Sequence, residues 1–277
     1  MPIIQTRVWL KHLFEGVSNR GLKKIPPFQR LMSHYPKWEK EEWLPFLYQQ
    51  GMLPIITSTK DEWDSWQKNY PSKGLVSFYE KIKTDFQGPD VDVFIFPINS
   101  HNENLEKVLK GKNGISFPDF ILLFFHEDVS LSNRKALLLH EYHHACRLYY
   151  QKNDEKSVTL LESMLMEGLA EWEVKRNLGE RYVTPWMTIY KKDFILTWWK
   201  RTLKERMDVR GRKNHLPYLF GGIQGFPKWL GYATGYEIVS SYMEKFPNKT
   251  TIELLKIPAK DIYLNSKFYE QIDGKKN

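Results

Sequence analysis

The spacing of apolar residues predicts helices toward both ends of the chain and strands between them. Residues 75–86 place large apolar side chains at helical intervals and so define one apolar helix face. Prolines divide the rest of the N-terminal region into short helices. These patterns predict a helical N-terminal subdomain over residues 1–88, with its boundary at Gly88-Pro89.

After this boundary the periodicity changes. Residues 91–96 are β-branched and aromatic and predict a strand, and a short helix is expected near residues 103–109. Residues 115–125 predict a second strand or a strand pair. Pro118 has no N–H to donate, so we expect it at a sheet edge or a bulge.

From Ser132 onward the pattern is helical again. Ser132 is a candidate N-cap for a helix that reaches about Tyr150, and a second helix is expected over residues 157–177, stopped by Gly179. The last clear helix includes residues 236–246. Together these patterns predict an α+β protein that is mostly helical, with a small sheet before the long helix that follows Ser132. They also predict a second domain over residues 89–277.

The long predicted helix carries a metal-binding motif. His140, Glu141 and His144 form the pattern H-E-x-x-H. Residues four apart on a helix are neighbours, so both histidines can turn a ring nitrogen onto one zinc ion. Glu141 is rotated by about 100° from His140 and can reach a water at the metal, as a general base must.

A catalytic zinc takes a third protein ligand, and the next predicted helix offers one. Glu167 and Glu171 are four residues apart and share a helix face, and 22 residues separate His144 from Glu167. We assign Glu167 to the metal and expect Glu171 to accept a ring N–H from a ligand histidine. Glu171 and Glu162 are the alternative third ligands, and we expect Glu162 to face solvent.

Together these motifs resemble a known family. H-E-x-x-H followed by E-x-x-x-E on a later helix is similar to the gluzincin metallopeptidases. With the segment Gly231 to Val239 added, the chain resembles the YjaZ-like family of predicted bacterial zinc-dependent proteases over about residues 85–270. The resemblance implies a zincin-like fold and a His, His, Glu zinc site. A metzincin is excluded, because Arg147 and Tyr150 occupy the positions of its glycine and third histidine.

Further residues are candidates for the reaction. An oxyanion donor is expected among His215, Tyr232 and Tyr236, with the tyrosines favoured, and flanking glycines would permit close backbone approach. Residues 114–116 (Gly114, Ile115 and Ser116) are positioned to bind an extended peptide along a strand edge. His143 falls outside the ligand spacing, so we expect it to pack or to support a ligand.

Composition and charge exclude some classes of protein and of metal site. The 277 residues are 42% hydrophobic and 27% charged, as in a globular protein, and the single cysteine, Cys146, excludes an intrachain disulfide and a cysteine-rich metal site. We expect Cys146 to behave as a small buried hydrophobe. The net charge is +8, and residues 191–213 hold nine Lys or Arg against three Asp or Glu. We expect a solvated helix face there in preference to a nucleic-acid interface.

These observations predict a zinc-dependent metallopeptidase that acts on a peptide or protein substrate. Two alternatives stay open: a zinc-stabilised binding protein without hydrolytic activity, and a basic nucleic-acid-associated regulator with a vestigial site. No apolar run approaches the ~20 residues of a membrane span. The N-terminus lacks the continuous apolar core of a signal peptide, so we predict a cytoplasmic location.

Overall fold

The computed structural model describes residues 3–15, 26–34, 40–54, 59–152, 156–222 and 225–272. The contacts within the chain divide it into two units, and each is described by itself. Unit 1 comprises residues 1–84 and 89–145, and unit 2 comprises residues 85–88 and 146–277. The division falls inside one continuous helix, α8 (Leu131–Gln151).

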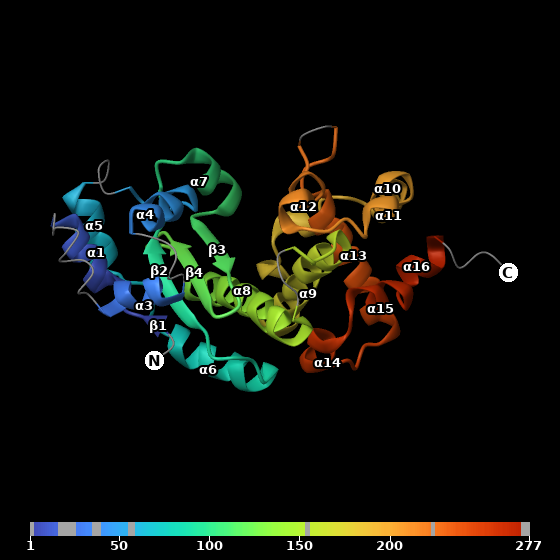
Figure 1. The fold of residues 1–277 in the computed structure, drawn as a ribbon, viewed down its shortest axis with the longest axis horizontal. Coiled ribbons are helices and arrows are strands. Elements are labelled where there is room, and N and C mark those ends of the chain that lie inside the picture. Colours follow the sequence, from blue (N-terminus) through green and yellow to red (C-terminus); the bar gives the residue numbers. More distant parts are fainter. Residues whose placement is uncertain are drawn as a thin grey trace. The chain divides into compact units, whose positions relative to one another are not determined.

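A four-stranded mixed sheet is the centre of unit 1. Its strands are β1 (Ile3–Ile4), β2 (Asp92–Pro97), β3 (Lys112–Ser116) and β4 (Phe120–Phe125), in the order β1-β2-β4-β3. β1, β2 and β4 run parallel, whereas β3 is antiparallel to β4 (Figure 1). Both central strands are buried at every position, which explains why their sequences are almost continuously apolar.

The predicted strand pair near residues 115–125 is confirmed as the hairpin of β3 and β4. The predicted place of Pro118 at a sheet edge or a bulge is wrong: Pro118 lies in the connection between the two strands, where its missing N–H costs no ladder hydrogen bond. The Phe117 N–H closes this turn on the Phe120 carbonyl at 2.8 Å. Among the described residues β3 pairs with β4 alone, so its other edge is an edge of the sheet.

Helices make up the remainder of unit 1. They are α1 (Thr6–Phe14), α3 (Pro26–His34), α4 (Lys40–Gln49), α5 (Lys60–Lys68), most of α6 (Leu75–Phe86), α7 (Glu103–Leu109) and the larger part of α8. The predicted short helices of the N-terminal region are therefore confirmed. β1 was not predicted, because two residues are too few to show a strand period.

Unit 2 is helical throughout the part that the structure describes. After the end of α8 come α9 (Leu160–Leu178), 3-10 turns at Glu180–Tyr182 and Pro185–Met187, α10 (Lys192–Trp198), a π-helical turn (Trp199–Leu203), α11 (Lys204–Arg206), α12 (Arg212–Leu219), α13 (Leu230–Lys245), α14 (Thr251–Lys256), α15 (Ala259–Leu264) and α16 (Lys267–Ile272). The predicted α+β class, with a small sheet before the motif helix, is confirmed.

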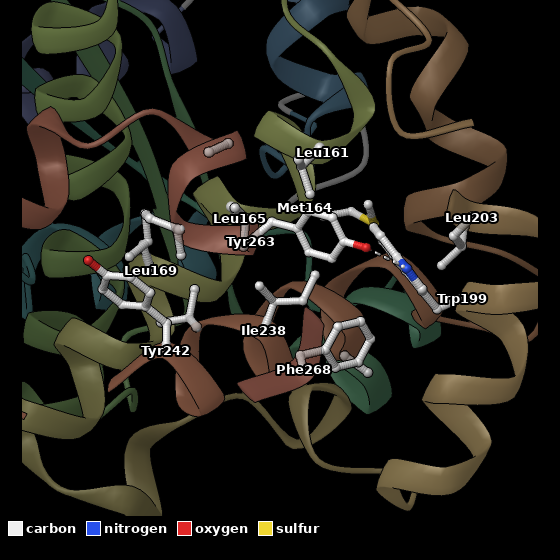
Figure 2. Packing of buried hydrophobic residues seen from close by; sticks show 14 of the residues in the cluster. Leu161, Met164, Leu165, Leu169, Trp199, Leu203, Ile238, Tyr242, Tyr263 and Phe268 are labelled. Carbon is white, nitrogen blue, oxygen red and sulfur yellow. Dashed lines mark hydrogen bonds between the residues drawn. The ribbon is translucent and has the colours of Figure 1, made fainter. Parts of the chain in front are cut away.

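Helices α9 and α13 meet backbone to backbone in the core of unit 2. A Cβ added at Gly235 would lie 1.9 Å from the Met164 carbonyl oxygen, and one at Gly168 would lie 2.4 Å from the Gly235 carbonyl. Neither position has room for a side chain. Figure 2 shows the apolar side chains gathered beside this contact, with the Trp199 indole N–H donating to the Tyr263 hydroxyl at 3.2 Å.

A buried guanidinium joins three segments of unit 2. Arg147 is fully buried, and its Nε and Nη2 donate to the two carboxylate oxygens of Glu162 at 2.7 and 2.9 Å. Its Nη1 donates to the carbonyls of Leu254 and Ile257 at 2.8 and 2.9 Å, near the end of α14. The expectation that Glu162 faces solvent is therefore wrong, because this ion pair holds it buried at 5% exposure.

Two predicted helix ends also need correction. α8 begins at Leu131, one residue before the predicted cap at Ser132, and the hydroxyl of Ser130 accepts the Asn133 N–H at 3.3 Å. α9 begins at Leu160 with Thr159 as its N-cap, whose hydroxyl accepts the Glu162 N–H. The predicted stop at Gly179 is confirmed, with φ at 103°.

Among the described helices none combines the length and the apolar character that crossing a bilayer requires.

The domain boundary predicted after residue 88 stays a prediction that residues 1–88 and 89–277 are separate domains.

The Arg147 interaction leads to a stability prediction. We expect Arg147→Met to lower the free energy of unfolding by about 3–5 kcal/mol, because Glu162 would be left charged and buried without a partner. Urea unfolding followed by circular dichroism measures the change. Lys107→Met is the matched control, since its ion pair with Glu103 is exposed on both sides and should have little effect. A loss at Arg147 no larger than at Lys107 would contradict this anchoring role.

Candidate metal centre

Helix α8 presents the two histidines of the motif on one face. The ring centroids of His140 and His144 lie 4.5 Å apart with an interplanar angle of 80°. His144 is buried at 4% exposure, whereas His140 is half-buried. This is the arrangement that the spacing of four residues predicts, with both imidazoles on the same side of a continuous helix.

The carboxylate of Glu141 packs against strand β3 within unit 1. The Ser116 hydroxyl lies 2.5 Å from Glu141 Oε2 and 2.7 Å from the Glu141 backbone carbonyl oxygen. A Cβ at Gly114 would lie 2.5 Å from Glu141 Oε1, so the absence of a side chain at this position makes room for the carboxylate. Gly114 and Ser116 are two apart on a strand and thus face the same way, toward α8.

Helix α9 carries the two predicted carboxylates in the interior of unit 2. Glu167 is 8% exposed and Glu171 is 2% exposed. One oxygen of Glu171 accepts the backbone N–H of Thr184 at 2.8 Å. This hydrogen bond fixes the orientation of the Glu171 carboxylate, and no sequence signal pointed to Thr184, which lies 13 residues later.

Helix α13 places the backbone of Tyr236 close to Gly168, which follows Glu167 on α9. A Cβ at Gly168 would lie 2.7 Å from the Tyr236 backbone nitrogen, so this position belongs to the same close contact of α9 and α13 as Gly235. Burial raises the pKa of the Tyr236 phenol to about 12, with the charges of Glu180 and Glu171 adding to the effect. Tyr236 therefore remains a protonated hydrogen-bond donor across the physiological pH range.

The other two candidate oxyanion donors have different surroundings. Tyr232 is half-buried, and its ring packs against those of Phe220 and Trp229, each 5.4 Å away. His215 is buried, with one ring nitrogen 2.8 Å from the Ser163 hydroxyl and the other 2.8 Å from the Val209 carbonyl. Because both nitrogens are engaged inside unit 2, His215 has a packing role, and burial lowers the pKa of its imidazole.

Among the described residues, His140, His144 and Glu167 each offer one ligand atom within 4.8 Å of the others. Zinc bonds to nitrogen and oxygen of about 2.0–2.2 Å put tetrahedral ligand atoms roughly 3.4 Å apart. Two imidazoles and one carboxylate are also a donor set that zinc accepts in catalytic sites, so the residues fit this metal.

Two residues near the motif are buried without belonging to this group. His143 is fully buried. This burial is compatible with both roles expected for it, packing in the interior and supporting a ligand. Cys146 is fully buried, as expected of a small apolar side chain. Neither belongs to the group of three possible metal ligands in the described part of the chain.

Comparison with known proteins supports the motif-based resemblance. A family model described as "Predicted Zn-dependent protease (DUF2268)" matches residues 72–264. The uncharacterized protein YjaZ of Bacillus subtilis (strain 168) is 32% identical over 266 residues, which cover 94% of this chain and 97% of that protein. The uncharacterized protein YjfC of the same strain is 26% identical over 197 residues, which cover 68% of this chain and 64% of that protein.

No solved structure matches the chain. The family model spans well over half of the sequence and includes every residue of the candidate metal centre. The full-length similarity to YjaZ extends the relationship to the N-terminal helices. The chain therefore belongs to the family of predicted Zn-dependent proteases, DUF2268.

Proposed function

We propose that this protein is a zinc metallopeptidase in which His140, His144 and Glu167 hold one zinc ion. The observation that carries the proposal is the proximity of these three side chains, two from α8 and one from α9. The family description, which names zinc and proteolysis, supports it independently. We also propose a zincin-like fold and a cytoplasmic location.

The chemistry follows from the donor set and from Glu141. Zinc bound at such a site supplies a Lewis acid, which polarises a carbonyl and lowers the pKa of a water. Glu141 then acts as the general base that takes the proton of the attacking water and passes it to the leaving amine. Its hydrogen bond from Ser116 and its contact with Gly114 support this role, because a base must be held in one position.

We propose that the substrate is a peptide segment bound in extended form along β3. This strand pairs with β4 alone among the described residues, so its outer edge offers backbone donors and acceptors to a further strand. Gly114 and Ile115 would contribute the peptide-binding edge. Ser116 would hold the general base in position, because its hydroxyl is hydrogen-bonded to the Glu141 carboxylate.

Residues around the ligands are proposed to position them or to stabilise charge. Glu171, whose carboxylate is fixed by the Thr184 N–H, would orient a ligand imidazole, and His143 would support the same group. Tyr236 is the proposed oxyanion donor, supported by its neutral phenol and the closeness of its backbone to Gly168. Tyr232, one turn earlier on α13, is the alternative donor.

The ligand assignment predicts how zinc content responds to substitution. We expect about one zinc per chain in the purified protein, and none after His140→Ala, His144→Ala or Glu167→Ala, because each change removes a direct bond. Glu171→Gln should retain the metal with an affinity ~10–100-fold lower, as for residues that orient ligands. Plasma mass spectrometry and competition with a chelating dye measure both quantities.

His101→Ala is the control for these substitutions, because this exposed histidine pairs with Glu62 outside the proposed site. It should keep the full zinc content. Stoichiometric zinc in Glu167→Ala would place the third ligand elsewhere on the chain. A greater loss in Glu171→Gln than in Glu167→Gln would reverse the roles of the two carboxylates.

The mechanism predicts a graded loss of peptidase activity. Glu141→Gln should keep zinc and stability but lose at least ~10²-fold in rate, because the base is gone. Ser116→Ala should lower kcat at least ~10-fold with KM and zinc content unchanged, because the carboxylate is present but less firmly positioned. Cleavage of a broad peptide library identifies a substrate, and steady-state kinetics on that peptide measure the effects.

Ser33→Ala is the control for Ser116→Ala, since it removes an exposed hydroxyl that bonds only the Arg30 carbonyl of its own helix. Its kinetics should equal those of the wild type. Equal cleavage by the wild type and Glu141→Gln would contradict the mechanism. Zinc-loaded wild type that cleaves no peptide would favour the non-hydrolytic binding protein instead.

A further inference from the structure

A strip of aromatic rings crosses unit 2 from α10 to α12. Tyr190 and Phe194 are stacked at 4.7 Å, and Phe194 lies 6.3 Å from Trp198. The strip continues from Trp198 to Phe226 at 6.0 Å and from Phe226 to Tyr218 at 5.1 Å. These five residues are called the aromatic strip below. Tyr190, Trp198, Phe226 and Tyr218 pack against the core of unit 2, and all five residues are at least partly accessible.

Arginine side chains lie over two rings of the aromatic strip. The guanidinium carbon of Arg201 is 5.9 Å from the Trp198 ring centroid, and that of Arg206 is 5.6 Å from the Tyr218 centroid. Arg206 also donates to the Tyr218 hydroxyl at 3.1 Å. Both arginines are exposed, so their charges are presented beside the rings and toward solvent.

Four basic residues within residues 191–213 have no acidic partner in the part of the chain that the structure describes. Among the residues that the structure describes, no carboxylate forms an ion pair with Lys200, Arg201, Arg206 or Lys213. On the C-terminal helices, by contrast, Lys245, Lys249 and Lys267 are each paired with a glutamate. Within residues 191–213, Lys192 is paired with Glu237, whereas Lys200, Arg201, Arg206 and Lys213 present positive charge without an acidic partner among the described residues.

Exposed apolar side chains concentrate in the same segment. Nine large hydrophobic residues are exposed in the described part of the chain, and four of them fall within residues 189–220. They are Ile189 (49%), Phe194 (39%), Leu216 (47%) and Phe220 (41%). Exposed aromatic and aliphatic groups next to uncompensated basic residues are typical of surfaces that bind the interface of a bilayer.

We propose that the aromatic strip and its flanking arginines bind the surface of a membrane that contains anionic lipids. The basic residues are complementary to acidic headgroups, and tyrosine and tryptophan favour the headgroup level, where one end of the side chain is apolar and the other hydrated. The protein would then associate peripherally. This inference does not rest on the zinc site, because every residue that carries it lies in α10 to α12 and their adjoining turns.

The surface fits a bilayer better than a single-stranded nucleic acid. Bases bind by stacking on accessible aromatic faces, whereas Tyr190 and Phe194 are stacked on each other at an angle of 19°. The faces of Trp198 and Tyr218 are approached by Arg201 and Arg206. Exposed Ile189 and Leu216 have no use in base stacking, but aliphatic side chains can insert among lipid chains.

Vesicle sedimentation of the full-length protein tests the proposal. We expect binding to vesicles of phosphatidylcholine with 30% phosphatidylglycerol, little binding to phosphatidylcholine alone, and weakening as salt is raised from 0.05 to 0.5 M. The double variant Arg201→Glu/Arg206→Glu should bind at least ~30-fold more weakly. Each basic residue near an anionic surface raises the affinity about fivefold, and the variant removes two of them. Phe194→Ser should also weaken binding, because it removes an inserted ring without changing the charge.

Lys256→Glu/Lys260→Glu is the matched control, with the same charge change at exposed lysines of α14 and α15. It should retain most of the binding, and circular dichroism should show that all variants are folded. Three results would overturn the proposal: no binding to anionic vesicles, equal loss in the control and in the arginine variant, or tighter binding to a single-stranded oligonucleotide than to the vesicles. Zinc content should be the same in all of these proteins.

Discussion

The buried ion pair of Arg147 and Glu162 is the interaction on which the packing of α9 against the end of α8 in unit 2 depends. It joins the last turns of α8 to the first turn of α9, and the third guanidinium nitrogen bonds carbonyls at the end of α14. A charge buried this deeply is tolerated only when every donor is satisfied.

A second constraint acts on Glu141, the proposed general base. Glu141 is buried between α8 and β3, where Ser116 supplies a hydrogen bond and Gly114 supplies space. A carboxylate that could rotate freely would lose much of its efficiency as a base, since small misplacements are costly. The same strand whose inner side holds Glu141 has an unpaired outer edge in the described sheet, which brings the proposed peptide-binding edge next to the base.

The sequence predicted the features that are local and missed those that depend on distant segments. The histidine pair follows from the helical interval of four, and the hairpin of β3 and β4 follows from a continuous apolar run with a proline in the middle. Glu162 was expected in solvent, because helix spacing cannot show that Arg147, 15 residues earlier, is its partner. Similarly, alternation places Gly114 and Ser116 on one face of a strand, but only the folded chain shows that this face meets Glu141.

The account depends most directly on where zinc binds. Anomalous difference maps from crystals of the zinc-loaded protein, recorded on both sides of the zinc absorption edge, locate the ion without reference to activity. The account predicts one strong peak about 2.0–2.2 Å from a ring nitrogen of His140, a ring nitrogen of His144 and a carboxylate oxygen of Glu167. A peak bound by Glu171 in place of Glu167, or no ordered zinc at the two histidines, would contradict it.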